Sequence, residues 1–119
     1  MVKNIYSITP ETVQNIHDGT GAVRVSLVAD RFASGLQFLH YTVLPPGSTI
    51  GSHKHGNNEE LYIILEGTGE MTLDSAAYTV TKGDVIVNNP HGTHGLRNTS
   101  DTQDLQLLVF EVAVYSNLR

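Results

Sequence analysis

The stretch Pro45–Gly69, PPGSTIGSHKHGNNEELYIILEGTG, places two histidines just before a long apolar run. His53 and His55 lie two residues apart, and Glu59 and Glu60 follow them. Side chains at positions i and i+2 point to the same side of an extended backbone. An extended segment here would aim two imidazoles at one point, with a carboxylate close behind in the sequence.

The residues around this stretch form short extended runs separated by turn residues. The runs alternate or are rich in β-branched and aromatic residues, and Gly, Pro, Asn, Asp and Ser lie between them. The predicted strands are Ala22–Ala29, Leu36–Leu44, Glu60–Glu66, Gly69–Asp74, Ala77–Thr81, Asp84–Asn88 and Leu105–Tyr115. This pattern predicts an all-β protein, either a sandwich or a barrel.

One segment, Thr9–Asp18, has the pattern of a helix start instead. Thr9 is a candidate N-cap, Pro10 fits the first helical position, and Glu11 lies in the first turn. Apolar residues are few in this segment, so we expect one or two helical turns at most.

Composition excludes several classes of function. The chain has 119 residues, which is typical of one domain, and a net charge of −5 with its seven Lys and Arg residues scattered. Nucleic-acid surfaces and polybasic membrane anchors need clustered cations, so neither is expected. The sequence has no cysteine, which excludes disulfides and thiolate chemistry. No apolar run reaches the length of a membrane span, and we expect a soluble cytoplasmic protein.

Two separate segments carry glycine, histidine and other turn or ligand residues at defined spacing. A His-x-His pair alone is a weak signal, but here it lies within a longer frame. The first segment contains Gly47, His53, His55, Glu60 and Gly67, and the second contains Gly83, Pro90, Gly92, His94 and Asn98.

Together the two segments resemble the two motifs of the cupin superfamily, and the resemblance covers roughly residues 36–115. The first segment, residues 47–67, matches the family pattern throughout. The second, residues 83–98, has one extra residue before Pro90 and one fewer between Gly92 and His94. The two shifts cancel, so His94 keeps the family's distance from Gly83.

The resemblance implies a single cupin domain over residues 1–119, folded as a double-stranded β-helix, which is a jelly-roll barrel. Because several strands are apolar on both faces, we also expect residues 1–30 to pack on the barrel or on a partner subunit. The resemblance also implies that one metal ion is bound by four residues, His53, His55, Glu60 and His94. His91 is the alternative to His94.

The donor set indicates which ions and which chemistry to expect. Three neutral imidazoles and one carboxylate suit a divalent transition ion such as Mn, Fe, Ni, Co, Cu or Zn. Four protein ligands on an octahedral ion leave positions open for water or substrate. We therefore expect a metal-dependent enzyme that acts on a small polar molecule bearing a carboxylate, hydroxyl or carbonyl group. Cupins span dioxygenases, isomerases, lyases and decarboxylases, and the alternative is a non-catalytic cupin that binds a small ligand or a structural metal.

Tyr62 and His40 are the candidate catalytic residues of the pocket. Tyr62 shares a strand face with Glu60, so it either orients a ligand or packs in the core. His40 lies in an apolar strand, where an imidazole needs a hydrogen-bond partner or access to a cavity. His17 is expected to be solvated or to cap the N-terminal turn.

The remaining aromatic and arginine residues have simpler expected roles. Four aromatic residues are predicted to lie in the core, and two arginines are predicted to form surface ion pairs rather than substrate clamps. The aromatic residues are Phe38, Tyr41, Tyr78 and Phe110, and the arginines are Arg24 and Arg97.

A homodimer is expected from the strand that follows the histidines. Glu60, Tyr62 and Ile64 share one face of this strand, and Leu61, Ile63 and Leu65 share the other. A strand that is apolar on both faces needs cover on both sides. A second copy of the chain could cover the outer face, and the alternative is that residues 1–30 do so.

Overall fold

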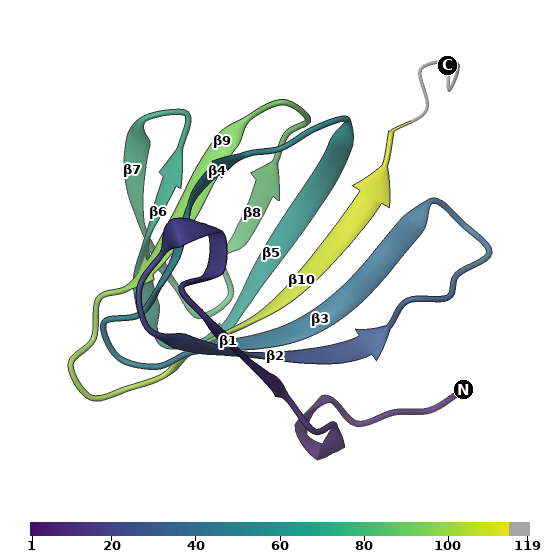
Figure 1. Cartoon of the computed structure of the whole chain (residues 1–119), viewed down its shortest axis with the longest axis horizontal. Helices are drawn as coiled ribbons and strands as arrows, with labels where there is room; N and C mark the ends of the chain where they lie inside the picture. The colour runs from purple at the N-terminus through teal and green to yellow at the C-terminus, as the bar shows by residue number, and fades with distance from the viewer. Residues whose placement is uncertain (115–119) are drawn as a thin grey trace.

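The computed structural model describes residues 1–114, which form ten β-strands and two short 3-10 helices (Figure 1). The strands are β1 (Glu11–Gln14), β2 (Ala22–Ala29), β3 (Leu36–Leu44), β4 (Thr49–Lys54), β5 (Asn58–Glu66), β6 (Thr68–Leu73), β7 (Ala76–Thr81), β8 (Val85–Asn88), β9 (Thr93–Asn98) and β10 (Leu105–Ala113). The helices are η1 (Ile5–Ser7) and η2 (Ile16–Asp18).

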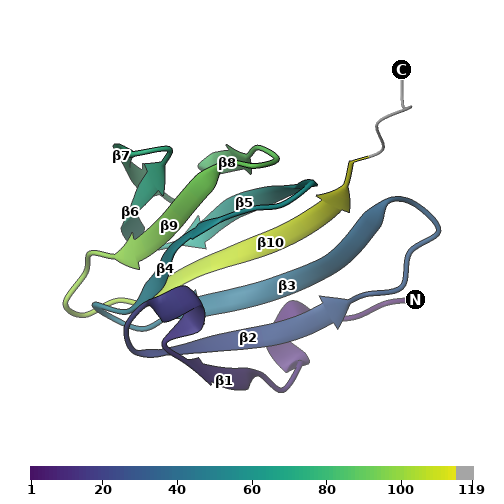
Figure 2. The same cartoon turned by 45° about the horizontal axis from the view of Figure 1, so that its top comes forward.

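The strands form two sheets that face each other (Figure 2). One sheet has six strands in the order β1-β2-β3-β10-β5-β8, and the other has four in the order β4-β9-β6-β7. This arrangement is the predicted all-β double-stranded β-helix. Side chains from the inner faces of both sheets form one core cluster, which includes Leu44, Ile64, Met71, Leu96 and Leu107.

The prediction of a helix over Thr9–Asp18 is wrong for most of the segment. Residues Glu11–Gln14 form strand β1, which pairs antiparallel with β2. The edge of β2 offers unpaired backbone groups, and pairing satisfies them better than an isolated helix with few apolar contacts could. Only η2 at the end of the segment is helical, and His17 within it has a left-handed φ of 51°.

The other predicted strands agree with the observed ones to within a few residues at their ends, although Tyr115 lies outside the described residues. Besides β1, the observed strands β4 and β9 were not among the predicted runs, although the extended backbone at His53 was anticipated. Tyr78 was expected in the core but is 53% exposed, because it lies on β7 at the edge of the smaller sheet.

Within residues 1–114, no helix is long and apolar enough to cross a membrane.

The outer face of the larger sheet is only partly covered by the N-terminal segment. Ile5 and Ile8 pack against a cluster that contains Tyr41 and Val43, and Leu65 joins the same cluster. The neighbouring residues Leu61 and Ile63 pair across the sheet with Val87 and Val85, which are 46% and 58% exposed. We call these four residues, Leu61, Ile63, Val85 and Val87, the outer apolar patch.

Candidate metal centre

Four side chains from both sheets meet between them. β4 and β9 carry His53 and His94 as direct register partners, His55 follows β4, and β5 supplies Glu60. One ligand atom from each residue lies within 4.8 Å of those of the other three. The Nε2 atoms of His55 and His94 lie 3.4 and 3.2 Å from Oε1 of Glu60. The structure therefore brings together the four residues named from the motif spacing.

Hydrogen bonds orient two of the imidazoles. His53 donates from Nδ1 to the carbonyl oxygen of Gly51 over 2.8 Å, and Nδ1 of His55 lies 2.6 Å from Oδ1 of Asn58. Each of these bonds uses Nδ1 and leaves the Nε2 lone pair free to bind an ion. Histidines that bind metals commonly make such a hydrogen bond with their other ring nitrogen. Nε2 of His55 is buried and has no hydrogen-bond partner in the described part of the chain.

His94, rather than His91, lies in this cluster. The side chain of His94 is 1% exposed, and its ring stacks on that of His55 with centroids 4.4 Å apart. His91 is exposed and has a left-handed φ of 63°, and its backbone N–H donates to the carbonyl of Gly56. His91 therefore helps to hold the loop after His55 and does not join the four-residue cluster.

Glu60 and Tyr62 are buried neighbours, of which one is ionised and the other is not. Burial raises the pKa of Glu60, but the hydrogen bond from His94 and the nearby imidazoles outweigh it and hold that pKa below its usual value. Burial and the Glu60 carboxylate raise the pKa of Tyr62 well above its usual value. Glu60 is thus an anion, whereas Tyr62 keeps its proton. The Tyr62 hydroxyl lies 3.4 Å from Nε2 of His94.

These residues fit a transition-metal ion. Three imidazoles and one anionic carboxylate are a donor set for such ions, and their atoms are already close together. The orphaned Nε2 of His55 supports the same interpretation, because a buried nitrogen without a partner costs free energy that a bound ion would offset.

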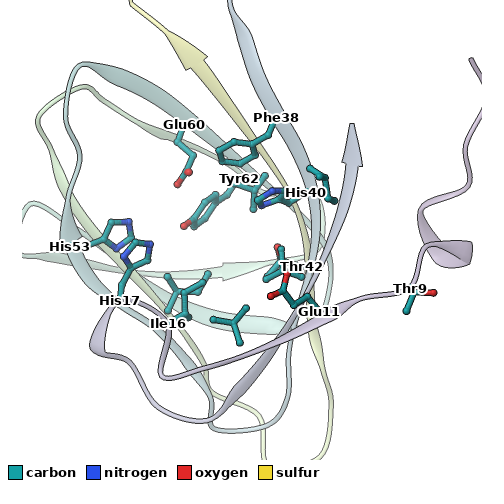
Figure 3. Close-up of a pocket in the computed structure, with 15 residues that line it drawn as sticks. Thr9, Glu11, Ile16, His17, Phe38, His40, Thr42, His53, Glu60 and Tyr62 are labelled. Atoms are coloured by element: carbon teal, nitrogen blue, oxygen red, sulfur yellow. The ribbon is translucent and has the colours of Figure 1, made fainter. Parts of the chain in front are cut away.

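A cavity of about 460 Å³ opens beside the cluster and contains His53, Glu60 and Tyr62 in its wall. His40 also lines it, and its ring stacks on Phe38 with centroids 4.1 Å apart. Figure 3 shows His17 against His53 on one side of the cavity and Phe38 with His40 on another. His40 therefore has access to a cavity, which was one of the two alternatives from the sequence.

His17 is the pocket residue that sequence reasoning missed. It is exposed, as expected, but its ring stacks on His53 with centroids 3.6 Å apart and an interplanar angle of 11°. The turn that carries it packs closely on β4, where the backbones of Gly19 and Gly51 meet. The sequence signal for this contact is the presence of Gly19 and Gly51. Two glycines alone are too weak a signal to place His17 beside His53, which lies far from it in the sequence.

The two arginines do not line this cavity. Arg24 pairs with Asp104 at 3.1 Å, and Arg97 pairs with Glu70 at 3.7 Å, with all four side chains at least 40% exposed. Both are the surface ion pairs that were predicted.

We expect the metal-free protein to lose stability in acid, partly because of His40. Burial lowers the pKa of His40, and the nearby Glu60 only partly opposes this effect. The unfolded chain therefore binds a proton at this site more readily than the folded chain. The stability that neutral His40 contributes is present above pH 6.5 and is lost as the pH falls below it. Urea unfolding from pH 7 to pH 5 should show a shallower loss for His40→Gln than for the natural sequence, and equal slopes would contradict the assignment.

Comparison with known proteins identifies the family. Residues 40–111 match the cupin domain. The chain therefore belongs to the cupin family, as the motif resemblance predicted.

Several relatives are named for small acids. An oxalate-binding protein of Thermotoga maritima is 33% identical over 110 residues, which cover 91% of this chain and 90% of that protein. A 5-nitrosalicylic acid 1,2-dioxygenase of a Bradyrhizobium species is 31% identical over 85 residues, which cover 71% of this chain but 38% of that protein. The crystal structure of a predicted oxalate decarboxylase from Thermotoga maritima superposes with a TM-score of 0.91 at 30% identity, over 96% of this chain and all of that one.

Proposed function

We propose that this protein is a metal-dependent enzyme that acts on a small polar molecule in the cavity beside the four-residue cluster. The observation that carries the proposal is the position of the cluster at the wall of an accessible cavity, since a purely structural site would be closed. The names of the relatives, one an oxalate-binding protein and one a dioxygenase, support a small acid as the bound molecule.

In this proposal, His53, His55, Glu60 and His94 hold one divalent transition ion. When bound, the ion supplies Lewis-acid chemistry, and iron would add chemistry with dioxygen. The chain's own residues in the cavity wall would orient the substrate.

Tyr62 and His40 are the proposed acid–base residues. Tyr62 is protonated and buried beside Glu60, so it can donate a hydrogen bond to a bound substrate oxygen. His40 has a pKa lowered by burial and is neutral near pH 7, so it can accept a proton from a substrate in the same cavity.

The second candidate function is a non-catalytic binding protein, favoured by the name of the oxalate-binding relative. Turnover separates the two candidates. Untagged protein loaded in turn with Mn, Fe, Co, Ni, Cu or Zn should convert a member of a panel of small hydroxy, oxo and aromatic acids. Tyr62→Phe and His40→Gln should each lower that rate, while the number of ions bound stays the same. Binding without turnover for every ion and acid would favour the non-catalytic candidate.

Removing the metal should lower the stability without unfolding the barrel. The core cluster contains twelve buried apolar residues and does not depend on the ion. Binding should add RT ln(1 + [L]/Kd) to the free energy of unfolding, or about 2.7 kcal/mol at a ligand concentration of one hundred Kd. Thermal unfolding with and without EDTA measures the difference. Unfolding of the whole domain on chelation would favour a structural metal instead.

We also propose that the protein is a homodimer through the outer apolar patch. Ile5 and Ile8 of the N-terminal segment pack against the same cluster as Leu65, whereas Val85 and Val87 are substantially exposed. A second copy that packs the same face against it would bury these side chains with two-fold symmetry. A cytoplasmic location is likewise a proposal, and it rests on the sequence alone.

Light scattering at micromolar concentration tests the dimer. The expected mass is twice the 13.0 kDa of one chain. Val85→Lys should shift it to that of the monomer, because a buried lysine without a partner is costly. Tyr78→Lys on the smaller sheet is the matched control and should stay dimeric. A natural chain that scatters as a 13.0 kDa particle overturns the proposal.

A further inference from the structure

The cavity beside the cluster carries negative charge in its wall and no positive charge. Its wall contains the carboxylates of Glu11 and Glu60, and no lysine or arginine of the described residues lines it. Glu111 on β10 is the register partner of Glu60, which adds a third carboxylate close to the same end. Apart from the proposed metal ion, this wall therefore offers no lysine or arginine that could pair with a negatively charged group of a substrate.

Much of the wall is apolar. Seven apolar side chains from five strands and η2 surround the space: Val13, Ile16, Val25, Leu27, Phe38, Ile50 and Val109. The cavity volume of about 460 Å³ falls within the range of pockets that hold drug-sized ligands. A molecule as small as oxalate would leave most of this space filled by water against apolar walls.

From this wall we infer that the substrate is a monoanionic chelating acid with an uncharged, largely apolar body. A 2-hydroxy acid or an ortho-hydroxy aromatic acid has this chemistry. The inference rests on the proposed metal centre, because the ion is the positive charge that would attract the acid group. The chelating end would face His53 and Glu60, while the body would lie against Phe38 and the valines.

The two ends of such a substrate have different partners for a physical reason. A buried carboxylate needs an opposite charge, and the proposed ion beside Glu60 is the place where the cavity offers one. An apolar body gains free energy when it leaves water for the apolar wall. A second carboxylate on the body would instead face Glu11 and be repelled.

Lactate and mandelate test the inference directly, because they share the same 2-hydroxy acid group and differ in having a methyl or a phenyl body. The protein loaded with Co²⁺ is titrated with each acid and with oxalate, and binding is followed by calorimetry and by the visible absorption of the cobalt. Mandelate is expected to bind on the order of tenfold or more tightly than lactate, since the phenyl group buries more apolar surface.

Two variants of one wall residue show whether the cavity sets this preference. Leu27 lines the cavity but is 47% exposed, so the fold should tolerate a polar residue there. Leu27→Glu should lower the affinity for mandelate at least fivefold more than that for lactate, whereas Leu27→Met should keep the natural ratio.

The outcomes separate this inference from the proposed function. If cobalt does not bind, the proposed metal centre itself fails. If cobalt binds and the absorption responds, but lactate or oxalate binds as tightly as mandelate, the metal centre stands and the inferred substrate class is wrong. An unchanged mandelate-to-lactate ratio in Leu27→Glu would also overturn the inference.

Discussion

Replacing His94 with alanine is expected to lower the affinity for a divalent transition ion by at least about 100-fold. His94 supplies a fully buried imidazole that lies 3.2 Å from Glu60 and 4.4 Å from the ring of His55. Its loss removes one proposed ligand of the ion and leaves the Glu60 carboxylate with fewer partners. Calorimetric titration of the metal-free protein with Mn²⁺ or Co²⁺ measures the change.

His91→Ala is the matched control for this substitution. His91 is exposed and lies three residues from His94 in the same segment, so its loss should leave the affinity within about twofold of the natural value, as expected for a surface residue. A large loss of affinity in His91→Ala together with unchanged affinity in His94→Ala would show that the ligand was assigned to the wrong histidine. Circular dichroism of both variants separates a binding effect from unfolding.

Gly51→Ala should destabilise the fold by about 3 kcal/mol and displace the turn that carries His17. A Cβ atom on Gly51 would overlap the carbonyl oxygen of His17 and lie 2.7 Å from the backbone nitrogen of Gly19. Both are backbone atoms, so no side-chain rotation relieves the contact. Urea unfolding measures the loss of stability, and the loss of the His17–His53 stack should be visible in the histidine ring signals by nuclear magnetic resonance.

Gly56→Ala provides the comparison. A Cβ on Gly56 has no neighbour within 4 Å, and its φ is not in the left-handed region, so this substitution should change the free energy of unfolding by less than about 0.5 kcal/mol. If Gly51→Ala is equally mild, η2 is not held against β4 as tightly as its geometry indicates.

The core of the candidate site could be predicted from the sequence because its residues lie in two compact motifs. His53, His55 and Glu60 are close in the chain, and an extended backbone already aims the first two together. His94 follows from the resemblance to the second cupin motif, in which it keeps the family's distance from Gly83, although β9 itself was not predicted. Strand β9, THGLRN, has a glycine and several polar residues, and its buried positions include His94 and Asn98, so hydrophobic alternation does not reveal it.

The N-terminal part of the site could not be predicted because long-range pairing decides it. The capping pattern at Thr9 and Pro10 is a local signal, whereas the free edge of β2 that captures Glu11–Gln14 is a tertiary feature. The position of His17 follows from that pairing and from three left-handed residues, Asn15, His17 and Asp18. Residues other than glycine rarely adopt this conformation, and a sequence does not signal where they will.

The central claim is that His53, His55, Glu60 and His94 bind one ion. Crystals of the protein grown with Mn²⁺ or Co²⁺ and measured at the absorption edge of that metal give the most direct test. The expected result is one anomalous peak at about 2.0–2.4 Å from a nitrogen of each histidine and an oxygen of Glu60. A peak elsewhere, or no peak between these four side chains in metal-saturated crystals, would contradict the claim.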